Sequence, residues 1–222
     1  MRELIEMKLA VFDFDSTLIH QEIIDELAER AGKKEHVARL TRETMEGKHR
    51  FADTIHLKTA ALAGLSFRDL EEIAAGVTFR EGFVDLVAQL KQNGAKIAVV
   101  SGSFTNILGQ LDGLKGFDDV YANQLVVQGG TLTGQCIAQV SDNKGEIVAH
   151  LQKKYGIAPK DTLAVGDGAT DIAMFKRAGV SIAFNAKPIV KQNASHAIDS
   201  ESLVPVLDIV RNQTKATATL EA

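Results

Sequence analysis

The chain has 222 residues, 45% of them hydrophobic, and a formal net charge of −4. This length allows one substantial hydrophobic core, alone or with a smaller appended domain. The net negative charge gives no sign of the basic surface that nucleic-acid-binding proteins carry. No apolar run reaches the roughly 18 residues that a membrane-spanning helix needs, and the N-terminus lacks the apolar region of a signal peptide. The single cysteine, Cys136, excludes an internal disulfide and indicates a reducing compartment. We therefore expect a cytoplasmic protein that binds neither nucleic acid nor membranes.

The first predicted element is a buried strand over residues 8–12, a largely hydrophobic run that ends in two carboxylates, Asp13 and Asp15. If the strand continues, residues at i and i+2 point the same way and the two side chains share a site. If the chain turns after Asp13, Asp15 comes round to face it. Neighbouring carboxylates repel unless a proton or cation lies between them, and a divalent metal is the usual partner. Asp-Ser-Thr is equally ordinary turn and helix-cap sequence, so the pair alone leaves both interpretations open.

The next sixty residues predict helices and no strand. Apolar residues recur at helical spacing over 19–31, a sparser rhythm continues through 33–50, and two further helices are expected over 51–62 and 66–75, the last with Ser66 as N-cap. A simple strand–helix–strand crossover needs only about 10–12 residues. This insertion therefore predicts a separate helical cap over residues 18–77.

The remainder alternates helices with strands. The predicted helices span 81–93, 104–111, 144–155, 171–178 and 201–211, the strands span 96–100, 162–165 and 180–184, and a β-hairpin within 121–140 turns at Gly129-Gly130. This alternation predicts an α/β fold with a Rossmann-like open parallel sheet and helices on both faces. Residues 1–17 and 78–211 would form the α/β core, and the polar segment 212–222 a flexible tail.

Open parallel sheets bind ligands at the carboxyl ends of their strands. That rule selects a short set of polar residues just past the strand ends: Asp13, Asp15, Ser101, Ser103, Asp167, Thr170 and Asp171. Carboxylate oxygens favour Mg²⁺ over zinc. A serine and a glycine at a strand end that opens a helix offer a hydroxyl and backbone N–H groups to an anion.

Lys144 stands at the start of a predicted helix, where the dipole disfavours a cation. It is therefore a candidate for contacting an anion, with an ordinary solvated lysine as the alternative. Together, the carboxylates, the serine–glycine pair and the lysine describe phosphoryl transfer, in which a carboxylate nucleophile takes the phosphoryl group.

Four segments in this order resemble the four motifs of the haloacid dehalogenase superfamily of phosphatases, a resemblance that covers roughly residues 7–211. The segments are Asp13-Phe14-Asp15-Ser16-Thr17, Val99-Val100-Ser101-Gly102, Lys144, and Gly166-Asp167-Gly168-Ala169-Thr170-Asp171. The helical insertion is similar to the cap of that superfamily. Further residues resemble the phosphoserine phosphatase family within it: Glu22, Met45-Glu46-Gly47, Phe51 and Ala183-Phe184-Asn185-Ala186-Lys187-Pro188.

The resemblance implies a role for each matching position. Asp13 would be the nucleophile, and Asp15 would protonate the leaving serine oxygen and then activate water. Mg²⁺ would be held by Asp13, the backbone carbonyl of Asp15 and Asp167, with Asp171 adjacent. The remaining roles are phosphate binding by Ser101, Gly102 and Lys144, and substrate binding by Glu22, Met45, Phe51, Lys58, His56 and Thr170. For Met45 and Phe51, packing inside the cap is the alternative role.

The implied function is Mg²⁺-dependent hydrolysis of a small phosphomonoester, O-phospho-L-serine in serine biosynthesis, by a monomer or homodimer. Three positions depart from the family pattern: Lys58 replaces an arginine, Ser103 a glycine and Thr170 an asparagine. Lysine keeps the charge of arginine but loses its bidentate fork, so a hydrolase or phosphotransferase for another small phosphomonoester is an alternative. A non-catalytic phosphate-binding regulator is a third reading, which the presence of both Asp13 and Asp15 disfavours. A dehalogenase ranks low, because it would not need the second aspartate to protonate a leaving group.

Overall fold

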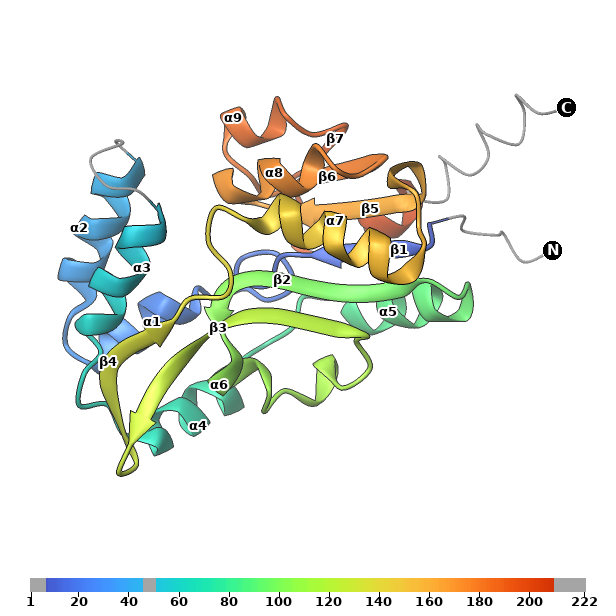
Figure 1. Ribbon diagram of the computed structural model, residues 1–222. Coiled ribbons are helices and arrows are strands. Elements are labelled where there is room, and N and C mark those ends of the chain that lie inside the picture. Colours follow the sequence, from blue (N-terminus) through green and yellow to red (C-terminus); the bar gives the residue numbers. More distant parts are fainter. Residues whose placement is uncertain (1–6, 46–50, 210–222) are drawn as a thin grey trace, which may run out of the picture.

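One open sheet forms the centre of the protein. The computed structural model describes residues 7–45 and 51–209, and within them seven strands pair in the order β4-β3-β2-β1-β5-β6-β7 (Figure 1). The strands are β1 (Leu9–Phe12), β2 (Lys96–Phe104), β3 (Asp119–Gln128), β4 (Thr131–Ile137), β5 (Thr162–Gly166), β6 (Val180–Phe184) and β7 (His196–Ile198). All pairings are parallel except that of β3 with β4. The predicted α/β sheet and the hairpin at its edge are confirmed.

The helices lie on both faces of this sheet and in the segment between β1 and β2. They are α1 (Ile23–Arg30), α2 (Lys34–Met45), α3 (Phe51–Ala60), α4 (Phe67–Gly76), α5 (Phe83–Gln92), α6 (Thr105–Leu108), α7 (Lys144–Tyr155), α8 (Ile172–Phe175) and α9 (Pro188–Lys191), and residues 204–209 are also helical. Alternate residues of β1 belong to two different hydrophobic cores, one on each face of the sheet. Leu9 and Val11 pack with residues of α7, α8 and α9, whereas Ala10 and Phe12 pack with residues of α5, α6 and the C-terminal helix.

The strand β1 occupies the middle of the sheet because all four of its residues are apolar and fully buried. It pairs with β2 on one side and with β5 on the other, and Phe12 lies opposite both Val99 and Val165. The carboxyl ends of these three strands therefore meet at one edge, which is the arrangement that the ligand-binding rule for open sheets requires.

The chain between β1 and β2 forms α1, α2, α3 and α4. The first of these helices begins at Ile23, later than the residue spacing suggested, because Ile19 forms an isolated antiparallel bridge with Phe79. The entry and exit of this helical segment thus run side by side, and the Gln21 side chain joins them by accepting from the Thr78 N–H at 3.4 Å. In Figure 1, α2 and α3 stand beside the end of the hairpin rather than over the sheet.

The β3–β4 hairpin packs against the helical segment. Gly129 and Gly130 at its turn both have positive φ, which glycine adopts without steric conflict. Backbone hydrogen bonds join Gly64 to Leu132 and Leu132 to Leu65. These hydrogen bonds join the edge of the sheet to the helical segment between β1 and β2.

Several short elements differ from the sequence prediction. The helix expected over 104–111 is limited to α6, because β2 continues through Phe104 and Gly109 follows the helix. The helix expected over 171–178 becomes a 3-10 turn, η3 (Ala169–Asp171), followed by α8. Strand β7 and helix α9 had no periodic signal because they have only three and four residues. The proposed tail, 212–222, lies outside the described residues.

Ser66 caps α4 as predicted, and its loss should destabilise the protein. Its side chain accepts from the Asp69 N–H at 3.2 Å, and the Asp69 carboxylate accepts from the Ser66 N–H at 2.8 Å. We expect Ser66→Ala to lower the free energy of unfolding by about 1 kcal/mol, measured by urea denaturation. Ser66→Thr keeps the hydroxyl and should lose less than half of that amount. Equal losses for the two variants would contradict the capping role.

Candidate active site

Asp13 and Asp15 lie where the central strand ends. The Asp13 N–H still donates to the Val165 carbonyl at 2.9 Å, so Asp13 continues the ladder with β5. The chain then turns, with the Thr17 N–H donating to the Asp15 carbonyl at 2.6 Å and Ser16 in the left-handed region at φ 54°. Of the two geometries left open by the sequence, the turn after the strand is the one formed. Both aspartates line the same pocket.

Lys144 is buried between two carboxylates. Its Nζ lies 3.1 Å from Asp13 Oδ2 and donates to Asp171 Oδ1 at 2.6 Å, and its side chain is only 2% exposed. Burial by itself would lower the pKa of Lys144, but Asp13 and Asp171 together raise it above its usual value. The ammonium group therefore stays charged in this site, and the solvated-lysine alternative does not describe it.

Two glycines allow these groups to come together. A Cβ on Gly166, at the end of β5, would overlap the Asp171 carboxylate, and a Cβ on Gly145 would lie 2.6 Å from the Ala173 carbonyl oxygen. The missing side chains let α7 and the 169–175 segment approach closely enough for Lys144 to reach Asp171. The Asp171 carboxylate is fixed further by the Gly168 N–H, which donates to its Oδ2 at 2.9 Å.

A cluster of three carboxylates has the composition of a metal site. One oxygen each from Asp13, Asp167 and Asp171 lies within 4.8 Å of the other two. Burial, together with the charges of Asp13 and Asp171, raises the pKa of Asp167 to about 8. Burial and the charge of Asp13 likewise raise the pKa of Asp171 to about 7, against the opposing effect of Lys144. Such mutual repulsion favours a bound cation, and an all-oxygen donor set fits a hard divalent ion.

The Asp15 side chain lies outside that cluster and in a different environment. Burial raises its pKa well above the usual value, and the charges of Glu22 and Asp13 add to this effect. A carboxyl group with a raised pKa is suited to general acid catalysis. The backbone carbonyl of Asp15, which accepts from Thr17, has a second lone pair for a further ligand.

Ser101 and Gly102 lie in the second half of β2 and line the pocket together with Asp13. The Ser101 hydroxyl is 1% exposed and accepts from the Ser103 N–H at 3.2 Å. Asn123, which the sequence analysis missed, donates to the Gly102 carbonyl at 3.0 Å and accepts at 2.8 Å from the N–H groups of Gln139 and Val140. It thereby connects β2 at Gly102 to the segment that leads to α7. An asparagine between the apolar residues of the predicted hairpin strand was the available signal in the sequence.

The pocket has a volume of about 560 Å³, within the usual range for a small-molecule site. The predicted residues that line it are Asp13, Asp15, Glu22, Lys58, Ser101, Gly102, Ser103, Lys144, Asp167 and Thr170. Asp171 lies buried behind Lys144, while His56 is exposed and is not among the lining residues. The side chains of Met45 and Phe51 lie outside the described residues. The sequence analysis missed these lining residues: Ile24, Thr41, Ile55, Asp142, Gly168, Ala169 and Ala173.

The helical wall of the pocket carries charges of both signs among apolar residues. The Ser16 hydroxyl donates to Glu22 Oε1 at 2.6 Å. Burial raises the pKa of Glu22, although this hydrogen bond opposes the shift. Burial lowers the pKa of Lys58, and the charges of Asp25 and Glu22 oppose that shift. A carboxylate and an ammonium group beside Ile24 and Ile55 suit a ligand that itself carries both charges.

These features define a class of protein. The family model for haloacid dehalogenase-like hydrolases matches residues 10–176, which span the described site from β1 to α8. The chain belongs to this family, as the four sequence motifs indicated. Among the described residues, every helix is too short or too polar to cross a lipid bilayer.

Within that family the chain is similar to phosphoserine phosphatases. It is 41% identical over 206 residues to the phosphoserine phosphatase of Methanocaldococcus jannaschii, covering 92% of this chain and 98% of the relative. It is 40% identical over 203 residues to that of Wolinella succinogenes, covering 90% and 98%. Among solved structures, a phospho-aspartyl intermediate analogue of phosphoserine phosphatase superposes with a TM-score of 0.85 at 41% identity, covering 91% of this chain and 98% of that one. A substrate-bound phosphoserine phosphatase complex gives the same TM-score and identity, covering 91% and 97%.

The raised pKa values predict an unusual dependence of stability on pH. Between the usual value of 3.8 and about 8, Asp167 binds a proton in the folded protein but not in the unfolded chain. The free energy of unfolding should therefore fall as pH rises through this window. We expect the Tm of EDTA-treated protein to decrease from pH 5 to pH 8 more steeply than that of an Asp167→Asn variant.

Cation binding should oppose this loss, because a metal ligand must be deprotonated. MgCl₂ should raise the Tm of the wild-type chain more at pH 8 than at pH 5, and should have a smaller effect on Asp167→Asn. Parallel pH profiles for the two proteins, without and with MgCl₂, would contradict the carboxylate cluster as the origin of the effect.

Proposed function

We propose that this chain hydrolyses O-phospho-L-serine to L-serine and inorganic phosphate, with Mg²⁺ as cofactor, and that it serves serine biosynthesis. The observation that carries the proposal is the position of Asp13, held 3.1 Å from the ammonium of Lys144 in a pocket that Glu22 and Lys58 also line. The names of its relatives support the same substrate. The proposed location is the cytoplasm, and the proposed assembly is a monomer or homodimer.

In the first step, an Asp13 carboxylate oxygen attacks the phosphorus atom and the bond from phosphorus to the serine oxygen breaks. The Asp15 carboxyl group gives its proton to the departing oxygen, which leaves as the hydroxyl of serine. The phosphoryl group is then an acyl phosphate on Asp13. The raised pKa of Asp15 supports this assignment, because the group must hold a proton before the step.

In the second step, Asp15 acts as a base. It takes a proton from a water molecule, whose oxygen attacks the phosphorus atom and displaces the Asp13 carboxylate. Inorganic phosphate is released, and both aspartates return to their starting protonation states. One residue thus serves both steps, since the proton that it gives to serine in the first step is replaced by a proton from water in the second.

Charge neutralisation is the main requirement of the first step, because an anion attacks a dianion. Unit charges about 4 Å apart interact by about 4 kcal/mol at an effective dielectric constant of 20. Lys144 supplies one positive charge, and Ser101 with the backbone of Gly102 would donate hydrogen bonds to the phosphoryl oxygens. Bound Mg²⁺ would be held by Asp13, Asp167 and the Asp15 carbonyl, and would supply two further positive charges beside the phosphoryl group.

Substrate recognition is assigned to the helical wall of the pocket. Glu22, oriented by the Ser16 hydroxyl, would accept the substrate ammonium group, and Lys58 would bind the substrate carboxylate. His56 is the weaker candidate for that carboxylate, because it is exposed and does not line the pocket. The segment 18–77 would act as a lid over the core formed by 1–17 and 78–211, and it would exclude bulk water from the acyl phosphate.

Lys58 also motivates a second candidate. A lysine offers one point charge where a bidentate guanidinium would match a carboxylate better. A substrate with a smaller or differently placed anionic group would therefore be compatible with the same catalytic residues. This candidate is a hydrolase or phosphotransferase for another small phosphomonoester.

Replacement of Asp13 tests the mechanism. We expect Asp13→Asn to lower kcat by at least about 10³-fold, because the nucleophile is lost, while the Tm of the metal-free protein does not fall, because a repelling charge is also lost. Turnover of phosphoserine with MgCl₂ and thermal unfolding would be measured together. Asp142→Asn, which alters another carboxylate of the same pocket, is the matched control and should change kcat by less than about 3-fold. Normal turnover by Asp13→Asn would exclude the acyl-phosphate route.

Replacement of Lys58 tests the substrate. We expect Lys58→Ala to raise KM for phosphoserine about 10-fold or more, because a charge-assisted contact is lost. It should leave KM for phosphoethanolamine, which has no carboxylate, within about 2-fold of the wild-type value. Lys58→Arg keeps the charge and should stay close to wild type with both substrates. An equal rise in KM for both substrates would remove Lys58 as the carboxylate partner and favour the second candidate.

A further inference from the structure

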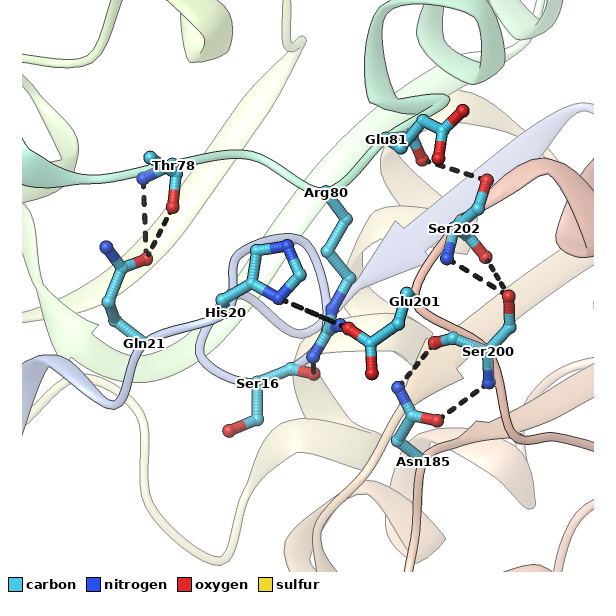
Figure 2. A network of polar contacts seen from close by, with 10 residues as sticks. All are labelled: Ser16, His20, Gln21, Thr78, Arg80, Glu81, Asn185, Ser200, Glu201 and Ser202. Carbon is cyan, nitrogen blue, oxygen red and sulfur yellow. Dashed lines mark hydrogen bonds and ion pairs between the residues drawn. The ribbon is translucent and has the colours of Figure 1, made fainter.

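A buried arginine lies outside the pocket, immediately behind the turn that carries Asp15. Arg80 follows the bridge residue Phe79 at the exit of the helical segment, and its side chain is 7% exposed. Its Nη2 donates to the Ser16 carbonyl at 2.9 Å, and its Nη1 lies 3.2 Å from His20 Nδ1. Figure 2 shows the guanidinium passing between His20 and Glu201 to reach Ser16.

The backbone of Arg80 is fixed on both sides. Its N–H donates to the Leu18 carbonyl at 2.9 Å, and its carbonyl accepts from the Phe83 N–H at 3.1 Å at the start of α5. The guanidinium also lies over the ring of Phe184, with Cζ 5.3 Å from the ring centroid. The backbone of Arg80 is therefore held in place, and its side chain is packed against Phe184 where it reaches Ser16.

Ser16 is the strained residue of the turn. A non-glycine residue in the left-handed region is disfavoured by about 1–2 kcal/mol and persists only where its surroundings hold it there. Three contacts do so: the Ser16 N–H donates to the Gln21 carbonyl at 3.1 Å, its hydroxyl donates to Glu22, and its carbonyl accepts from Arg80. Of these, the bond from Arg80 is the one that comes from a distant part of the chain.

The Ser16 carbonyl and the Thr17 N–H belong to one planar peptide unit. Arg80 holds the carbonyl side of this unit, and the Asp15 carbonyl accepts from its N–H side at 2.6 Å. Because the peptide is planar, a rotation that releases one end displaces the other. The Thr17 hydroxyl in turn donates to Asp167 Oδ1 at 3.2 Å. A change in the orientation of this peptide would therefore alter the hydrogen bonds to Asp15 and Asp167 and, through the Ser16 hydroxyl, the one to Glu22.

We propose that Arg80 is a positioning residue for the reaction: by holding the Ser16 carbonyl, it fixes the turn that presents Asp15 to the leaving group and Glu22 to the substrate. The expected effect of Arg80 on kcat rests on the proposed function. Its structural part, that Arg80 immobilises the Ser16–Thr17 peptide, stands on the contacts alone.

Ion pairing does not account for the burial of this arginine. The carboxylate within ion-pair distance of Arg80 in the described part of the chain is that of Glu201, at 3.5 Å, and the Glu201 side chain is 89% exposed. Exposed partners of this kind contribute little to stability. Within the described residues, Arg80 Nε is buried and has no hydrogen-bond partner, a further unfavourable feature. The shortest polar contact of the guanidinium is the bond to Ser16, which identifies that bond as its main role.

The test compares Arg80→Met and Arg80→Lys with two controls in the full-length protein. Glu201→Gln removes the exposed charge and keeps the bond to Ser16. Arg30→Met removes an arginine that joins α1 to α4 through Asp69 and Glu72 and lies away from the turn. Amide hydrogen exchange over residues 14–19, kcat with phosphoserine and with p-nitrophenyl phosphate, and Tm would be measured for each variant.

For Arg80→Met we expect faster exchange of the Thr17 amide and a fall in kcat of about 10- to 100-fold with both substrates, at temperatures well below its Tm. Arg80→Lys, which can still reach one acceptor, should recover part of both losses, and it serves alone if Arg80→Met does not fold. Both controls should keep wild-type exchange over 14–19 and kcat within about 2-fold, even where Tm falls.

Unchanged exchange over 14–19 in both Arg80 variants would overturn the proposal, as would a fall in kcat that Arg30→Met reproduces at an equal loss of Tm. If the wild-type chain hydrolyses no phosphomonoester, the proposed function fails. The exchange measurement then still decides whether Arg80 immobilises the turn.

Discussion

The buried ammonium of Lys144 between Asp13 and Asp171 is the interaction on which the site depends. Four carboxylates at the ends of β1 and β5 or just beyond them would repel one another without it, and burial strengthens that repulsion. Removing one partner from a buried ion pair leaves an uncompensated charge, which is more unfavourable than never having had the pair. The folded chain therefore needs Lys144 at this place, and even with Lys144 the pKa values of Asp167 and Asp171 stay raised. This remaining imbalance is what makes the site suitable for a divalent cation and a phosphoryl group.

The same electrostatic arrangement separates the roles of two aspartates that stand only two residues apart. Asp13 still belongs to the sheet and lies against the ammonium group of Lys144, a position suited to a nucleophile. Asp15 lies at the start of the turn and near Glu22, and its burial there favours the protonated form. A turn of the backbone thus produces two different chemical environments from two identical side chains. The turn depends on Ser16 in an unfavourable conformation. The contact that Arg80 makes with Ser16 from outside the pocket is therefore relevant to chemistry inside it.

The helical segment supplies a further part of the pocket lining, with one carboxylate and one ammonium group of its own. The core residues of the pocket, Ser101 and Lys144 among them, suit any phosphoryl group and carry no information about the remainder of the substrate. Glu22 and Lys58 come from the segment between β1 and β2, together with the apolar side chains of Ile24 and Ile55. The proposed specificity therefore rests on few residues, and the substitution of lysine for the usual arginine at position 58 falls on one of them.

The sequence by itself determined the α/β sheet, the hairpin at Gly129-Gly130, the cap of α4 at Ser66 and the set of strand-end residues that line the pocket. These features depend on local spacing and on one general rule for open sheets, so they can be read without coordinates. The tertiary structure decided between a continued strand and a turn after Asp13, gave Asn123 and Arg80 their contacts, and placed His56 away from the pocket lining. It also ended the helix after Leu108 early, because β2 extends through Phe104. Each of these outcomes depends on side chains that are distant in the sequence and meet only in the folded protein, where burial and partners, rather than residue type, set the charge and position of a group.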